Sequence, residues 1–238
     1  MSFLILVRHG QSIWNLEKRF TGWVDVDLTE NGKLEAEKAG ELIKKMNIKI
    51  DTYYSSLQLR AKNTLKIIQR ILNDENKSFS KNWQLNERHY GALTGLNKIE
   101  TVNKIGEKKV HEFRRSWDIR PDPLAKESPY HPNNIDTYKD LPKEIIPNTE
   151  SLKDTYERVT KFYENILKDD LKDKNILISA HGNSIRALCK FLFKLSNEQI
   201  SKLEIPTGNP LVLEIDKQYN IQNCKYLDQE RAKDLVVF

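Results

Sequence analysis

Two short apolar runs, each followed by a His-Gly pair, constrain the fold of this chain more than any other feature. Phe3–Val7 leads into Arg8-His9-Gly10, and Ile176–Ser179 leads into Ala180-His181-Gly182. Apolar runs of this length without polar alternation are typical of strands buried in a parallel sheet. In such folds, ligands bind beyond the carboxyl ends of the strands. If the two strands are neighbours, His9 and His181 converge on one pocket.

The rest of the chain alternates between expected strands and expected helices. Thr29 can cap a helix whose apolar positions include Leu34, Leu42, Ile43 and Met46. This alternation predicts an α/β fold, a three-layer α/β/α arrangement with a mostly parallel central sheet. Further strands are expected over Ile50–Ser55, Trp83–Leu85, Leu211–Ile215 and Gln222–Leu227, and further helices from Ser55 or Ser56, near Ser151–Lys168 and over Ser184–Lys194.

The periodicity weakens between Gly91 and Asn148. An irregular stretch of this length inside a compact domain is usually a functional lid or a disordered linker. We therefore expect a single domain over residues 1–238, with a lid-like insertion at about 91–148. Six of the eight prolines fall in this stretch: Pro121, Pro123, Pro129, Pro132, Pro142 and Pro147.

Composition excludes several classes of protein. The apolar start of the chain is too short for a signal peptide, and no stretch approaches the ~20 apolar residues of a membrane helix. We expect a cytoplasmic enzyme without a membrane partner. The net charge of +5 comes from scattered lysines, which disfavours nucleic acid and leaves a solvated surface or attraction of an anionic substrate. Cys189 and Cys224 predict neither a disulfide nor a zinc site.

A histidine at such a strand end suits phosphoryl transfer. A neutral imidazole can attack phosphorus without losing a proton, and the phosphoramidate that forms can pass its phosphoryl group on. The transferred group is heavily charged and needs fixed cations around it. Arg8 is adjacent to His9, and Arg60 should lie in the first turn of the helix after the second strand. The glycine after each histidine is expected to let phosphate oxygens approach the backbone.

Two alternatives concern the same residues. Histidines also bind zinc, but neither His9 nor His181 has a partner at helical i, i+4 spacing, and no compact carboxylate cluster could hold magnesium. We therefore predict no metal. Glu87 follows a probable strand, and its carboxyl group could act as a general acid and base or simply pair with Arg88 on the surface. Residue chemistry leaves both roles of Glu87 open.

Three motifs resemble those of the cofactor-dependent phosphoglycerate mutase family of the histidine phosphatase superfamily. The likeness runs from Leu4 to about Glu230, and the stretch Asn86–Gly91 is much more specific to the mutases than Arg-His-Gly. The motifs are Leu6-Val7-Arg8-His9-Gly10-Gln11-Ser12, Leu85-Asn86-Glu87-Arg88-His89-Tyr90-Gly91 and Ala180-His181-Gly182-Asn183-Ser184.

The resemblance implies roles for these residues. His9 would be the phosphorylated nucleophile and Glu87 the general acid and base, while His181, Arg8 and Arg60 stabilise the phosphoryl group in flight. The reaction would interconvert 2-phosphoglycerate and 3-phosphoglycerate, with 2,3-bisphosphoglycerate as the priming phosphoryl donor. Asn15, Thr21, Gly22 and Asn183 would line the phosphate pocket, Arg88, Tyr90, Lys98, Arg114 and Arg115 would hold the rest of the anionic substrate, and Gly10, Gln11, Ser12, His89 and Gly182 complete the expected binding set.

Two other functions compete with the mutase. A histidine-type phosphatase would use the same His9 chemistry, but the long insertion with Arg114 and Arg115 argues against it because a mutase must exclude water. A binding module without catalysis would have lost the nucleophile or the acid, and both are present. The resemblance implies a homodimer, with a tetramer possible. In relatives the C-terminal tail helps close the active site; here it is short and ends Val236-Val237-Phe238.

Overall fold

The computed structural model describes residues 1–233 and is built on a six-stranded sheet of order β3-β2-β4-β1-β5-β6. Strands β1, β2, β3 and β4 run parallel to one another, while β5 pairs antiparallel with β1 and β6 pairs antiparallel with β5. This confirms the predicted α/β fold with its mostly parallel sheet. The strands are β1 (Ser2–Arg8), β2 (Thr52–Ser55), β3 (Ser80–Lys81), β4 (Ile176–Ala180), β5 (Leu211–Ile215) and β6 (Ile221–Tyr226).

The two strands that carry the His-Gly pairs are neighbours. β1 and β4 pair in parallel with Arg8 opposite Ala180, and the backbone N–H of His9 donates to the carbonyl of Ala180 at 3.0 Å. The register therefore brings both histidines to the same height just beyond the sheet edge. Their expected convergence is confirmed.

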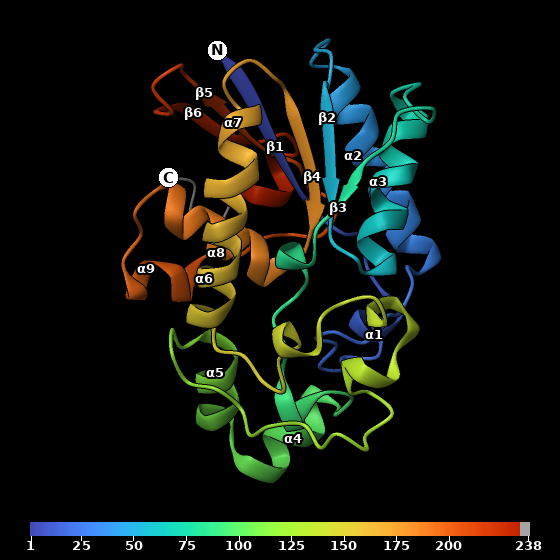
Figure 1. Ribbon diagram of the computed structural model, residues 1–238, viewed down its shortest axis with the longest axis vertical. Helices are drawn as coiled ribbons and strands as arrows, with labels where there is room; N and C mark the ends of the chain where they lie inside the picture. The colour runs from blue at the N-terminus through green and yellow to red at the C-terminus, as the bar shows by residue number, and fades with distance from the viewer. Residues whose placement is uncertain (234–238) are drawn as a thin grey trace.

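Helices cover both faces of the sheet (Figure 1). The apolar run of β1 explains this, because its residues alternate between two cores. Ile5 and Val7 pack with the face covered by α2 (Glu30–Lys44) and α3 (Leu59–Ile71).

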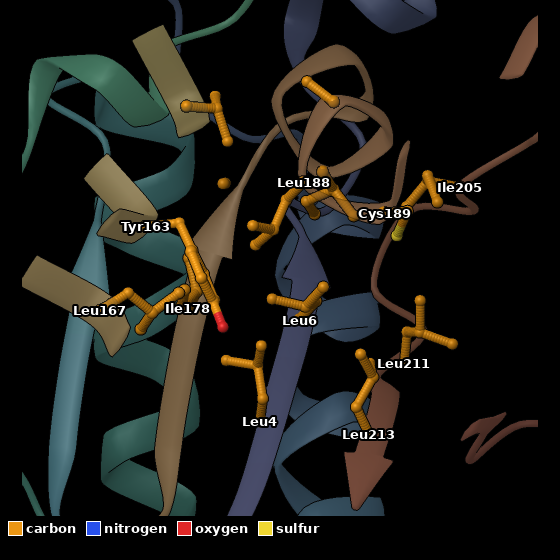
Figure 2. Close-up of a cluster of buried hydrophobic side chains, with 14 of the residues drawn as sticks. Leu4, Leu6, Tyr163, Leu167, Ile178, Leu188, Cys189, Ile205, Leu211 and Leu213 are labelled. Carbon is orange, nitrogen blue, oxygen red and sulfur yellow. The ribbon is translucent and has the colours of Figure 1, made fainter. Parts of the chain in front are cut away.

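Leu4 and Leu6 point to the opposite face and pack with α6 (Leu152–Phe162) and α8 (Gly182–Leu192). Figure 2 shows Leu4 and Leu6 beside Ile178, with Leu188 contributed from α8. All of these leucines are at most 1% exposed, and burying each side chain stabilises the fold by about 1.5–3 kcal/mol.

Local hydrogen bonds set where the first two long helices begin. Thr29 caps α2 as predicted, because its hydroxyl accepts the N–H of Gly32 at 3.0 Å. Leu34, one of the apolar positions of this helix, is 62% exposed, since the buried stripe of α2 runs through small residues such as Ala36 and Ala39. α3 begins at Leu59, later than expected, because side-chain acceptors hold the preceding residues outside the helix.

The expected strand over Trp83–Leu85 is also wrong. These residues form a 3₁₀ turn, and the short strand β3 precedes them. Pairing with β2 ends when the N–H of Asn82 donates to Ser55, after which the N–H of Leu85 turns back to Asn82. The apolar residues of this stretch suggested a strand because Leu85 is buried, at 1% exposed, but it is buried in a turn.

The segment 91–148 lies beyond the carboxyl ends of β1, β2 and β4 (Figure 1). It is irregular, as expected, except for the helices α4 (Lys98–Ile105) and α5 (Glu107–Arg115) and four 3₁₀ turns over Gly91–Leu93, Pro132–Asn134, Asp136–Tyr138 and Lys143–Ile145. The remaining short elements are α1 (Ile13–Leu16), a π-helical stretch over Tyr163–Leu167 that continues α6 into α7 (Lys168–Asp170), α9 (Asn197–Lys202) and a 3₁₀ turn at Glu230–Ala232.

Within residues 1–233, no helix is long and apolar enough to cross a membrane. The tail that ends Val236-Val237-Phe238, expected from the resemblance to bear on closure of the site, lies outside the described residues.

Candidate active site

A pocket at the carboxyl edge of the sheet collects most of the predicted residues. It carries six cationic side chains and two carboxylates, so it suits a strongly anionic ligand. β1, α3, α8 and the segment 91–148 all contribute to it. Its lining is Arg8, His9, Asn15, Thr21, Gly22, Arg60, Glu87, Tyr90, Lys98, Arg114, Arg115, Gly182, Asn183, Arg186, Glu204 and Ile205.

His9 presents one ring nitrogen to this pocket. Its Nδ1 lies 2.7 Å from the carbonyl of Gly10, which can only accept, so Nδ1 carries the hydrogen. Nε2 then holds the free electron pair and accepts the Nε–H of Arg60 at 3.3 Å. Burial, followed by the charges of Arg60 and Arg8, lowers the pKa of His9 well below its usual value. The ring is therefore neutral at pH 7, with Nε2 available as a nucleophile.

Arg60 is a buried guanidinium that forms no ion pair with a carboxylate of residues 1–233. It is 1% exposed, and its Nη atoms donate to the carbonyls of Val24 and Gly22, each at 2.9 Å. Arg8 is fixed from the other side by a 2.8 Å bond from Nη1 to the carbonyl of Ile205. Because neutral carbonyls position both arginines without cancelling their charge, a phosphoryl group on His9 would meet two fixed cations.

His181 stands next to His9, with the ring centroids 4.9 Å apart. Its Nε2 lies 2.8 Å from the hydroxyl of Ser56, which holds the ring. Burial, Arg60 and His9 lower the pKa of His181 well below its usual value. His181 is thus neutral and fully buried beside His9, and its Nδ1 has no hydrogen-bond partner among the described residues.

Glu87 places a carboxyl group on the pocket wall, 9% exposed. Its Oε1 accepts the N–H of Arg88 at 2.6 Å, and its own N–H donates to Gln58 Oε1 at 2.8 Å. Glu87 is therefore not the exposed partner of an Arg88 guanidinium. A held carboxyl group at this place is suited to proton exchange with a bound alcohol.

The segment 91–148 contributes positively charged side chains to the wall of the pocket. Lys98 comes from α4, and Arg114 and Arg115 come from the last turn of α5. Burial is the largest cause of the lowered pKa of Lys98, and Arg114 lowers it further. Tyr90 completes this wall, because its hydroxyl accepts a 3.1 Å bond from Asn183 Nδ2.

Six of the residues predicted for the site lie outside the pocket lining.

The glycine after His9 has a different role from the one expected, because a Cβ on Gly10 would come within 2.0 Å of the carbonyl oxygen of Gly32. Gly10 therefore lets two backbone segments touch. Ser12 caps α1, with its hydroxyl accepting the N–H of Asn15 at 3.2 Å. The six residues are Gly10, Gln11, Ser12, Arg88, His89 and His181.

Arg88 and His89 support the wall from behind. The guanidinium of Arg88 lies 4.6 Å from the ring centroid of Tyr90, and its Nη2 donates to the carbonyl of Phe113 at 2.8 Å. His89 is fully buried 6.4 Å from the ring of Trp23, and burial lowers its pKa to about 3. The structure therefore brings neither side chain to the pocket surface, although both are adjacent to residues that reach it.

Sequence reasoning missed two charged residues of the pocket. Arg186 lies one helical turn after Asn183 on α8, so its i, i+3 spacing could have revealed it. Burial, then Arg115, lower the pKa of Arg186 to about 10. Glu204 lies in an irregular loop and forms an ion pair with Arg115. No sequence signal marks Glu204.

No group of three histidine, cysteine, aspartate or glutamate side chains that could hold a metal occurs among residues 1–233. The expected absence of a metal stays a prediction. Cys189 and Cys224 are free thiols.

A model of the histidine phosphatase superfamily (branch 1) matches residues 4–133 and 128–223 of the chain. The chain belongs to this superfamily. It is 70% identical over 239 residues to a 2,3-bisphosphoglycerate-dependent phosphoglycerate mutase of Pelagibacter ubique (strain HTCC1062), with 100% of both sequences covered. The enzyme of that name from Hydrogenobaculum sp. (strain Y04AAS1) is 45% identical over 238 residues, covering 99% of this chain and 96% of the relative. The resemblance inferred from the motifs is confirmed.

The fold recurs at low sequence identity. A mycobacterial glucosyl-3-phosphoglycerate phosphatase solved with VO3 superposes with a TM-score of 0.70 at 20% identity, covering 95% of this chain and 97% of that one. At this identity the match supports the histidine phosphatase fold alone. The fold therefore does not decide between a mutase and a phosphatase, and the residues of the pocket must be considered.

Proposed function

We propose that this chain interconverts 2-phosphoglycerate and 3-phosphoglycerate through a phosphohistidine at His9, primed by 2,3-bisphosphoglycerate. The observation that carries the proposal is a buried His9 whose Nε2 lies 3.3 Å from Nε of Arg60, in a pocket lined by six cationic side chains. The full-length likeness to the curated mutases supports the choice of substrate. A doubly phosphorylated carboxylic acid fits a pocket in which several arginine donors are held ready for anionic oxygens.

In the proposed reaction, the enzyme starts with a phosphoryl group on Nε2 of His9. The substrate 3-phosphoglycerate then binds in the pocket. A hydroxyl of 3-phosphoglycerate attacks the phosphorus and the P–N bond breaks, while Glu87 takes the hydroxyl proton. The bisphosphate then reorients in the pocket. Nε2 of His9 attacks the other phosphoryl group, the P–O bond breaks, and Glu87 returns its proton to the leaving oxygen, which releases 2-phosphoglycerate.

Each charged residue has a stated part in this scheme. Arg8, Arg60 and His181 surround the phosphoryl group while it lies between nitrogen and oxygen. Lys98, Arg114 and Arg115 retain the second phosphate and the carboxylate during reorientation. We propose that the segment 91–148 acts as a lid over the pocket, because water that reached phosphorylated His9 would divert the enzyme to hydrolysis.

The alternative is a histidine-type phosphatase with the same nucleophile. A coupled assay with 3-phosphoglycerate, run with and without 2,3-bisphosphoglycerate, separates the two. We expect isomerisation that depends on the bisphosphate, with little release of inorganic phosphate. Phosphate release without isomerisation would overturn the mutase proposal.

Labelling of His9 tests the intermediate itself. Radiolabelled 2,3-bisphosphoglycerate should transfer one phosphoryl group to the protein in an acid-labile linkage, and His9→Ala should take up none. Turnover should also persist in EDTA, because the scheme requires no metal; inhibition by the chelator would contradict this. The homodimer remains a prediction from the resemblance, testable by light scattering. The cytoplasmic location remains a prediction from the sequence, testable by fractionation.

A further inference from the structure

An arginine behind the pocket holds the backbone on both sides of Glu87. Arg158, on α6, is 6% exposed and forms a double ion pair with Glu150, from Nε at 2.7 Å and from Nη2 at 3.0 Å. Its Nη1 donates to the carbonyls of Gln84 at 2.6 Å and Asn86 at 2.9 Å, and its Nη2 also donates to the carbonyl of Glu87 at 3.0 Å. Five bonds occupy the five N–H groups of this guanidinium.

Glu150, the carboxylate of this ion pair, holds the backbone at His89, after Glu87 in the chain. Oε2 of Glu150 accepts the N–H of His89 at 2.7 Å, and the N–H of Glu150 donates to the carbonyl of His89 at 3.0 Å. With Gln58 holding the N–H of Glu87 at 2.8 Å, the backbone is anchored before, at and after the residue that carries the acid.

Arg158 differs from the arginines of the pocket in having no N–H left over. Nε of Arg8 is buried without a partner among the described residues, and so is Nε of Arg186, which also lines the pocket. Those groups can still bind an anionic oxygen, whereas Arg158 could do so only by releasing the Glu87 loop or Glu150. Arg158 therefore holds other groups in position, through charge-assisted bonds between largely buried partners.

We propose that Arg158 and Glu150 are positioning residues that hold the Glu87 carboxyl group at the distance where it exchanges a proton with the bound hydroxyl. The inference rests on the proposed function, in which Glu87 is the general acid and base. Proton transfer requires the acid within hydrogen-bond reach of the oxygen, and a displacement of about 1 Å can cost on the order of 10²-fold in rate.

A double-mutant comparison tests this directly. Arg158→Lys keeps the charge but removes the planar fork, so it should slow single-turnover phosphorylation of His9 by 2,3-bisphosphoglycerate by roughly 10²-fold. The same change in a Glu87→Gln background should slow it less than about threefold, because the group being positioned is already gone. The single-turnover rate constant is independent of how much of the sample is folded.

Glu150→Gln provides a second variant of the same shape. It keeps the side-chain volume but sets an amide N–H against the donors of Arg158 or His89, and it should show the same dependence on Glu87. Arg70→Lys is the matched control, since Arg70 lies on α3, is 57% exposed and pairs with Glu37 at the surface. Its rate should stay within about twofold of the native rate.

The outcomes separate the inference from the proposed function. Equal slowing by Arg158→Lys in both backgrounds, or no slowing in the native one, would overturn the positioning role. Failure of the native protein to take up label, or an unchanged rate in Glu87→Gln alone, would instead overturn the proposed mechanism. Loss of thermal stability with an unchanged single-turnover rate would assign Arg158 a purely structural role and contradict the inference.

Discussion

Nε of Arg60 lies 3.3 Å from Nε2 of His9, so the cation is directed at the nitrogen that would bind phosphorus. The same guanidinium is anchored by its Nη atoms on the carbonyls of Gly22 and Val24. Arg60→Lys keeps the charge but cannot make these contacts together. We expect the rate of His9 phosphorylation to fall by roughly 10³-fold, measured by rapid-quench labelling, with overall folding preserved.

Arg70→Lys is the control for that variant. Arg70 lies on the same helix, α3, but is 57% exposed and pairs with Glu37 at the surface. Its labelling rate should match that of the native protein. A fall of less than tenfold in Arg60→Lys would show that one positive charge is sufficient and that the fork geometry is unimportant.

Stability should decline below about pH 6.5 because three histidines are buried in neutral form. The pKa values of His9 and His181 are lowered well below the usual value, mainly by burial, and that of His89 is lowered to about 3. Below the unfolded pKa of about 6.5, these histidines bind protons in the unfolded chain but stay neutral in the folded one. The free energy of unfolding therefore falls as pH falls. Each histidine contributes about 1.4 kcal/mol per pH unit.

Urea unfolding between pH 8 and pH 5 checks this sign. The free energy of unfolding should be flat above pH 7 and decline steadily below it. His89→Gln removes one of the three groups without entering the pocket, so the slope between pH 6 and pH 5 should become shallower by about 1.4 kcal/mol per unit. An unchanged slope would mean that His89 is protonated in the folded protein.

The proximity of His9 and His181 could be predicted from the sequence because the ends of buried parallel strands can be recognised there. The apolar runs before His9 and His181 identify two parallel strands, and parallel neighbours bring their ends to one edge. Glu204 could not be found this way, since it reaches the pocket from a loop whose path depends on the packing of Ile205 and Tyr226. Trp83–Leu85 was misassigned as a strand because burial in a turn and burial in a strand leave the same apolar signal.

The two glycines that follow the histidines should differ in their tolerance of alanine. A Cβ on Gly10 would lie 2.0 Å from a carbonyl oxygen of α2, whereas the nearest atoms to a Cβ on Gly182 belong to the flexible side chain of Arg8, at 3.5 Å. Gly10→Ala should cost at least about 1–3 kcal/mol, because backbone must move. Gly182→Ala, at the start of α8, should change stability by less than about 1 kcal/mol. Thermal and urea unfolding compare them, and equal losses would contradict this distinction.

Glu204 places a carboxylate inside a pocket built for anions. It pairs with Arg115, which is 18% exposed, while Glu204 itself is 50% exposed. The carboxylate therefore competes with a substrate anion for the arginine and repels the substrate's own charge. Glu204→Gln should lower the KM for 3-phosphoglycerate by about two- to fivefold, as expected for an ion pair worth up to ~1 kcal/mol.

The salt dependence of KM and a control variant, Glu198→Gln, test the prediction for Glu204. The gain in affinity should shrink between 0.05 M and 0.5 M salt, because screening weakens both the ion pair and the repulsion. Glu198→Gln is the control, since Glu198 pairs with Lys202 at 78% exposure and is absent from the pocket lining. A raised KM in Glu204→Gln would show instead that the ion pair with Glu204 aligns Arg115 for the substrate.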